Sequence, residues 1–144
     1  MLIKILVAAG SASDRLNIKN MLSEYCVLTS CDSEEAMHML EEHDGINLLI
    51  LDLNTPNMNG LQVLEALKED DRFRKLRTII LTNNDELDNE IKGLELGAVD
   101  YIRKPIHKDS LKNRIDVHVA LLCAEQALEQ QLEEQTLTFD MIFD

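Results

Sequence analysis

Residues 46–51 read INLLIL, the most apolar run in the chain, and Asp52 follows directly. A short, continuous run of isoleucine and leucine is typical of a strand that is buried on both faces of a sheet. Residues 43–45 (HDG) break the helical pattern before it, and a loop rich in proline and asparagine follows it as far as Gly60. We therefore predict a central strand over residues 46–51 that presents Asp52 at its carboxyl end.

Strand and helix patterns alternate on both sides of this central strand. Further strands are predicted over residues 2–8, 26–30, 78–81 and 99–102, and helices over residues 12–25, 33–42, 61–68, 85–96 and from about 109 onward. Asp32 or Ser33 can cap the second helix, and Gly97 is suited to end the fourth. Strand–helix units repeated with short loops predict an α/β fold, a doubly wound five-stranded parallel sheet with helices on both faces.

The composition fits one globular domain and a short remainder. The 144 residues, 45% of them hydrophobic, suffice for a single core, and we expect a domain over residues 1–122 with a helical linker over residues 123–144. A formal net charge of −13 repels nucleic-acid phosphates, so we expect no direct nucleic-acid binding. The chain shows no signal segment and no apolar run of the roughly 18 residues that span a membrane. Three irregularly spaced cysteines suit free thiols in the reducing cytoplasm.

Polar residues follow three of the predicted strands. Asp52 follows the third strand, Thr82 the fourth, and Lys104 comes just after the fifth. Because parallel strands end at one edge of an open α/β sheet, where ligands bind, these side chains are expected to lie close together. A carboxylate can attack phosphorus as a nucleophile, and a hydroxyl and an ammonium group can bind the phosphoryl oxygens. The three residues therefore predict phosphate chemistry at that edge.

Three sequence stretches resemble the motifs of a known family. Residues 52–60 read DLNTPNMNG, Thr82 lies thirty positions after Asp52, and residues 97–105 read GAVDYIRKP. In this order they resemble the D-x-x-x-P-x-x-x-G, threonine and G-A-x-D-Y-x-x-K-P motifs of response-regulator receiver domains, the chemotaxis-regulator-like modules of two-component signalling. The resemblance covers residues 1 to about 122 and implies a flavodoxin-like fold with strand order 2-1-3-4-5.

The resemblance also implies roles for individual residues. Asp52 would accept a phosphoryl group from a histidine kinase or a phosphotransfer protein, Thr82 would contact that group, and Lys104 would pair with it. Tyr101 would be the aromatic switch residue that swings inward when Thr82 engages phosphate; the alternative is a half-buried aromatic side chain on an edge strand. The Lys104–Pro105 bond would be cis. The domain would be a phosphoacceptor rather than an enzyme, although an attached output domain can be one.

The sequence departs from the family at the metal site. Receiver domains have two adjacent acids after the first strand, which hold a divalent cation together with the phosphoacceptor, but alignment on Arg15 places Ala9 and Gly10 there. Neither side chain can ligate a cation, so we expect a much weaker Mg²⁺ site. Asp52 and the carbonyl oxygen of Asn54 are the ligands that remain for it.

The polar residues nearest to Ala9 and Gly10 are expected to be helix caps rather than replacements for the missing acids. Ser11, Ser13 and Asp14 fall at the start of the first predicted helix, where such side chains are expected to act as caps. Two functions therefore compete. In one, Asp52 is still phosphorylated, slowly or with help from a partner kinase. In the other, a degenerate receiver acts as a phosphorylation-independent dimerisation or interaction module. A hydrolase with Asp52 as its nucleophile would need a cap segment and a substrate pocket, which so short a chain lacks.

The last predicted helix continues well past one ordinary helix length. Leu121, Ala124, Leu128 and Leu132 form an apolar seam among Glu and Gln residues, which is shorter than the three or four heptads typical of a coiled coil. This segment is either a solvated extension or a helix that pairs two copies into a homodimer. The final residues, LTFDMIFD, are apolar enough to open a further domain, so we expect an output domain beyond them, as in a sensor kinase or a cyclic-dinucleotide enzyme.

Overall fold

A computed structural model of the chain describes residues 2–55, 59–83 and 85–143, with the side chains of residues 139, 140, 142 and 143 left aside. Pro56, Asn57 and Met58 of the first motif therefore lie outside the described residues. The chain forms two compact units, residues 1–112 and residues 113–144. The first unit contains the whole sheet.

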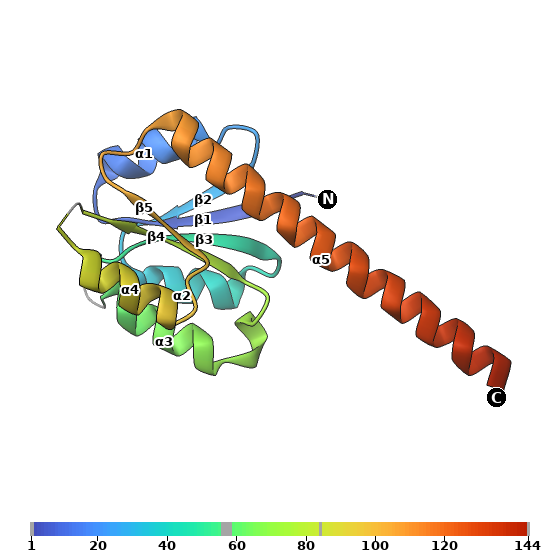
Figure 1. The fold of residues 1–144 in the computed structure, drawn as a ribbon. Coiled ribbons are helices and arrows are strands. Elements are labelled where there is room, and N and C mark those ends of the chain that lie inside the picture. Colours follow the sequence, from blue (N-terminus) through green and yellow to red (C-terminus); the bar gives the residue numbers. More distant parts are fainter. Residues whose placement is uncertain (1, 56–58, 84, 144) are drawn as a thin grey trace. The chain divides into compact units, whose positions relative to one another are not determined.

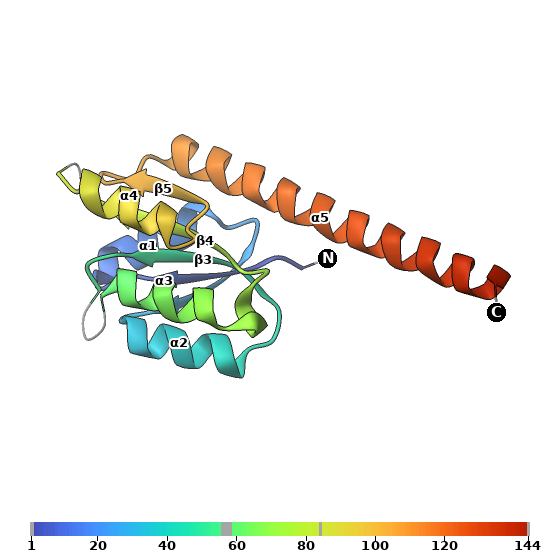
Figure 2. The same cartoon turned by 60° about the horizontal axis from the view of Figure 1, so that its bottom comes forward.

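The first unit is a five-stranded sheet with helices on both faces, and its pairings are all parallel. In chain order the elements are β1 (Lys4–Ala8), α1 (Ala12–Met21), β2 (Cys26–Ser30), α2 (Ser33–Glu42), β3 (Ile46–Asp52), α3 (Gly60–Glu69), a short 3₁₀ helix η1 (Asp71–Phe73), β4 (Arg77–Thr82), α4 (Leu87–Glu95), β5 (Asp100–Arg103) and α5 (Lys108–Phe143). The strand order is β2-β1-β3-β4-β5, so the predicted fold class and order are confirmed. Figure 1 shows α1 on one face and α2, α3 and α4 on the other, and the turned view in Figure 2 brings these three helices forward.

β3 lies at the centre of the sheet, as its apolar run predicts. In the parallel register Leu51 is paired with Ala8 of β1 on one side and with Ile80 of β4 on the other. Residues 48–52 are all buried. The face covered by α2 and α3 packs a core cluster whose members include Ala8, Ala36, Leu49, Leu51, Val63, Leu64 and Ile80. Burial on both faces explains why this strand lacks the alternation of a half-exposed one.

The first helix ends earlier than the sequence pattern indicates. We expected it to reach residue 25, but α1 ends at Met21. The Tyr25 N–H donates to the Leu22 carbonyl in a turn, and the Cys26 N–H then donates to the Ile3 carbonyl as the chain enters β2. Residues 22–25 therefore form the turn between α1 and β2 rather than a further turn of the helix. Most other boundaries agree within about two residues, the usual uncertainty of helix ends.

Gly60 allows the start of α3 to lie against the loop that follows β3. A Cβ atom at this position would lie 2.6 Å from Leu53 Cδ2 and 2.7 Å from Leu53 Cα, too close for packed atoms. The Gly60 N–H also donates to the Leu53 carbonyl oxygen at 3.1 Å. A side chain at the last position of the first motif would therefore clash with Leu53, and glycine lets α3 begin close to the residues that follow Asp52.

The second unit is the remainder of α5. Its exposed apolar side chains include Leu121, Leu128 and Leu132 of the predicted seam. Within the described ranges, no helix combines the length and hydrophobicity needed to cross a bilayer. The proposed boundary between the domain and its linker, at residues 122 and 123, stays a prediction.

Candidate functional site

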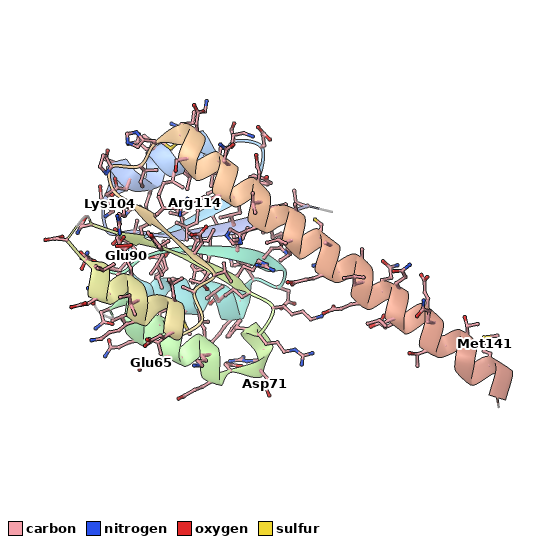
Figure 3. The ribbon with its side chains drawn as sticks, in the orientation of Figure 1. Glu65, Asp71, Glu90, Lys104, Arg114 and Met141 are labelled. Atoms are coloured by element: carbon pink, nitrogen blue, oxygen red, sulfur yellow. The ribbon has the colours of Figure 1, made fainter. Side chains whose placement is uncertain are left out.

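The carboxyl edge of the sheet brings the predicted polar residues onto neighbouring strands. Asp52 is the last residue of β3 and is 4% exposed, and Thr82 is the last residue of β4 and is fully buried. In the register, Asp52 pairs with Leu81, and Thr82 pairs with Arg103, the residue before Lys104. Figure 3 labels Lys104 just beyond the end of β5. The predicted convergence on one edge is therefore observed, while the roles of the residues remain to be tested.

Lys104 lies between two carboxylates. Its Nζ donates to Asp52 Oδ2 at 2.5 Å and lies 3.5 Å from Asp14 Oδ2. Burial opposes the charged ammonium group, but hydrogen bonds and charge from Asp52, and then from Asp14, outweigh it and raise the pKa of Lys104 above its ordinary value. Lys104 is therefore a fixed positive charge at the edge of the sheet.

Asp14 does not act as the helix cap that we expected. Ser11 is the N-cap residue of α1, and its hydroxyl accepts from the Asp14 N–H at 3.3 Å. The Asp14 carboxylate is directed instead to Lys104. In the sequence, this role of Asp14 could be suspected only from its place in the first turn of α1. The first turn of a helix that follows a parallel strand lies over the carboxyl edge of the sheet.

Asn54 links Asp52 to an acid that the sequence reading missed. The Asn54 N–H donates to Asp52 Oδ1 at 3.0 Å, and its Nδ2 donates to Glu86 Oε1 at 2.8 Å. Asn83 Nδ2 donates to the same Glu86 oxygen at 2.8 Å. Burial alone would raise the pKa of Glu86, but hydrogen bonds from asparagine side chains and the charge of Lys104 lower it overall. No sequence motif identifies Glu86, because its contact with Asn54 forms only when the loops after β3 and β4 meet.

Thr82 carries a buried hydroxyl with unused hydrogen-bonding capacity. Its Oγ1 is fully buried and has no partner among the described residues, whereas its backbone carbonyl accepts from the Lys104 N–H at 2.8 Å. A buried polar group left unpaired costs about 1–3 kcal/mol, so such a group suits a ligand oxygen that arrives later. The Lys104–Pro105 peptide bond beside it is cis, as the resemblance implied.

Tyr101 lies on β5 and is half-buried. The Arg103 guanidinium lies over its ring, with its central carbon 5.4 Å from the ring centre. Arg103 Nε in turn donates to both oxygens of Glu90, at 3.0 and 3.2 Å, and Glu90 is only 1% exposed. This position is compatible both with a switch residue and with a plain edge-strand aromatic.

The side chains at this edge do not fit a divalent cation. Arg15 Nη1 donates to the carbonyl oxygens of Ala9 and Gly10, at 2.6 and 3.1 Å, so a guanidinium already contacts the positions where the acids are missing. One oxygen of Asp52 is bound by Lys104. Across the residues that the structure describes, no group of three or more His, Cys, Asp or Glu side chains could hold a metal ion. Mg²⁺ is usually held by one or two carboxylates together with waters, and here the carboxylate of Asp52 is already paired with an ammonium group. The weak Asp52–Asn54 site stays a prediction.

Comparison with known proteins agrees with the fold and the motifs. The family model described as the response regulator receiver domain matches residues 5–116. The chemotaxis protein CheY1 of Helicobacter pylori is 33% identical over 117 residues, which cover 79% of this chain and 94% of that protein. The transcriptional regulatory protein CiaR of Streptococcus pneumoniae is 34% identical over 143 residues, which cover 98% of this chain but only 59% of that protein.

A solved structure shows the same architecture. The signal receiver domain of a Luxo repressor protein from Vibrio parahaemolyticus superposes with a TM-score of 0.82 at 26% identity. The superposition covers 90% of this chain and 98% of that one.

Proposed function

The chain belongs to the response regulator receiver family, and from this premise we propose that it accepts a phosphoryl group on Asp52 from a histidine kinase or a phosphotransfer protein. The observation that supports this most directly is the 2.5 Å contact between Lys104 Nζ and Asp52 Oδ2 at the edge of the sheet. A nearly buried carboxylate held by one ammonium group, next to a strand that ends in an unpaired hydroxyl, suits a phosphoacceptor.

The proposed transfer uses three side chains of this chain. An oxygen of Asp52 forms a bond to phosphorus while the bond between phosphorus and the donor's imidazole nitrogen breaks. Lys104 moves its hydrogen bond from the carboxylate to a phosphoryl oxygen, and the Thr82 hydroxyl donates to another. The receiver supplies the acceptor and the charge around it, so the domain is not itself a catalyst acting on further substrates.

We further propose that phosphorylation switches an attached output domain. Tyr101 and Pro105 would transmit the change from Thr82 and Lys104 to the outer face of β5. The match to CiaR covers 59% of that protein, so CiaR is longer than the matched region, and its name describes it as a transcriptional regulatory protein. We expect a cytoplasmic protein that pairs through α5 and, given its formal net charge of −13, does not itself bind nucleic acid.

The phosphorylation-independent alternative is less favoured. A module that works only through surface contacts has no use for the unpaired Thr82 hydroxyl or for a lysine held between Asp52 and Asp14. Buried polar groups of this kind cost stability, so they are expected where chemistry needs them.

The test is phosphorylation of the whole chain by acetyl phosphate or by purified histidine kinases, followed by intact-mass measurement. We expect the mass of one phosphoryl group on the wild type and none on the Asp52→Asn variant. Asp44→Asn is the matched control, because it removes an exposed aspartate just before β3. Equal phosphorylation of Asp52→Asn and the wild type, or no phosphorylation of the wild type by any donor, would overturn the proposal.

A further inference from the structure

We infer that the Asp52 site works without a divalent cation, because Arg15 and Lys104 supply fixed positive charge where other members of the family hold a metal ion. The exclusion of the cation can be tested alone. Only its consequence, phosphoryl transfer to Asp52 in the absence of metal, rests on the proposed function.

Arg15 is held at the carboxyl edge of the sheet, beside the end of β1. Its Nη1 donates to the carbonyl oxygens of Ala9 at 2.6 Å and Gly10 at 3.1 Å, the two residues that immediately follow β1. Ala8, at the end of β1, is paired with Leu51, the neighbour of Asp52. The guanidinium is therefore held at the same edge of the sheet as Asp52, through charge-assisted hydrogen bonds that are stronger than neutral ones.

The charged side chains around Asp52 include both acids and bases. Asp52 and Asp14 contribute two negative charges, and Lys104, in contact with both, contributes one positive charge. Arg15, the neighbour of Asp14 on α1, contributes the second positive charge. The charges of these four side chains balance, and Glu86, which Asn54 and Asn83 bind, leaves the site with one net negative charge rather than the larger excess of an acidic metal site. A divalent cation at Asp52 Oδ1 would lie beside the ammonium group that already holds Oδ2, and both basic groups would repel it.

Phosphorylation of Asp52 adds negative charge at this edge of the sheet. When acetyl phosphate is the donor, an Asp52 oxygen bonds to phosphorus, the bond from phosphorus to the acetyl oxygen breaks, and acetate leaves with the electron pair. The acyl phosphate carries more negative charge than the carboxylate that it replaces. Lys104, already in place, and Arg15 are then the cations that neutralise it, as preorganised charges do in other transfer sites. Arg15 is a positioning residue, since it contacts the backbone rather than the reacting atoms.

The direct test is Mn²⁺ binding, followed by the electron paramagnetic resonance signal of the free ion. An acidic surface binds some Mn²⁺ at random, so the measured quantity is the binding that Asp52→Asn removes. We expect the wild type and Asp52→Asn to bind equally. The double variant Ala9→Asp with Gly10→Asp, which restores the acidic pair, is expected to gain a site that a further Asp52→Asn abolishes. An Asp52-dependent Mn²⁺ site in the wild type would overturn the inference.

The second test is the rate of phosphorylation by acetyl phosphate in EDTA and in MgCl₂. We expect the two wild-type rates to agree within about twofold, and Arg15→Ala to lower the EDTA rate by about tenfold or more, the scale of losing one preorganised charge. Arg15→Lys, which keeps the charge, should retain more of the rate. Lys19→Ala removes an exposed charge from the same helix and should change nothing.

The outcomes separate the two proposals. A wild type that is phosphorylated only with Mg²⁺ keeps Asp52 as the phosphoacceptor and overturns metal independence. A wild type that is phosphorylated under neither condition overturns the phosphoacceptor proposal, and the Mn²⁺ measurement still decides whether the site excludes cations.

Discussion

Lys104 is the residue on which the site depends most. Its ammonium group touches Asp52 and Asp14, and its side chain is 25% exposed while that of Asp52 is 5% exposed. An ion pair this sheltered is screened less by solvent than a surface pair, although the exposed part of Lys104 reduces its contribution. Asp52 would be left buried without its cation if Lys104 were removed.

We predict that Lys104→Met lowers the free energy of unfolding by about 1–3 kcal/mol at neutral pH, because it leaves a buried carboxylate without its charged partner. The pKa of Lys104 is raised in the folded state, so this stabilisation is complete below the ordinary lysine pKa of about 10.4 and is lost as pH rises above it. Urea unfolding at several pH values measures both effects.

The matched control for Lys104 is Lys92→Met, an exposed lysine on α4. The difference in stability between wild type and Lys104→Met should shrink at strongly alkaline pH, while the difference for Lys92→Met stays near zero throughout. A Lys104→Met variant as stable as Lys92→Met at neutral pH would contradict the prediction.

Among the elements, α4 is hydrogen-bonded both to the loop after β3, beside Asp52, and to β5. Glu86, at the N-cap position of α4, accepts from Asn54 in the loop after β3. One turn further, the buried Glu90 accepts from Arg103 of β5, whose guanidinium lies over Tyr101. A shift of α4 would therefore alter polar contacts at both places, so α4 and β5 should move together.

We predict that Glu90→Gln lowers the free energy of unfolding by about 1–3 kcal/mol, because Arg103 loses the carboxylate that accepts its hydrogen bonds and a neutral amide takes its place. The loss stays below that of a fully buried pair, since the Arg103 side chain is 45% exposed and can be solvated. Chemical denaturation gives the stability, and the NMR signals of the Tyr101 ring report whether Arg103 leaves it. Glu95→Gln, at an exposed position of the same helix, should change neither; equal behaviour of the two variants would refute the role of Glu90.

At the scale of the whole molecule, α5 extends far beyond the residues that match the family. The match ends at residue 116, whereas α5 continues to Phe143. Leu121, Leu128 and Leu132 are 47%, 59% and 62% exposed, and they recur at helical spacing. An exposed apolar seam on a long helix is the pattern by which two helices pair.

We predict that the full chain is a homodimer and that truncation after residue 122 makes it monomeric, because Leu128 and Leu132 of the exposed seam are removed. The double variant Leu128→Glu with Leu132→Glu should have the same effect without shortening the chain. Gln130→Glu is the control, since it adds charge to the same helix without replacing a leucine. Sedimentation velocity over a range of concentrations measures the state, and a monomeric full chain at high concentration would rule out pairing through α5.

Most of the fold could be predicted because its signals are local. The apolar run of β3, the caps at Asp32 and Gly97, and the polar ends of β3 and β4 each depend on a few adjacent residues. The end of α1 was predicted about four residues too far, because the chain turns between Leu22 and Tyr25 before it enters β2. Helical periodicity alone does not show where such a turn begins.

The parallel sheet, the family and the polar residues Asp52, Thr82 and Lys104 at or just after strand ends could all be inferred from the amino-acid pattern alone. These follow from side-chain periodicity and from the rule that parallel strands end at one edge. The folded chain was needed to show that Asp14 and Glu86 join the site and that Arg15 binds the carbonyl oxygens of Ala9 and Gly10. Hydrogen bonds and ion pairs act over a few ångströms, and side chains far apart in sequence reach that range only once the chain is folded.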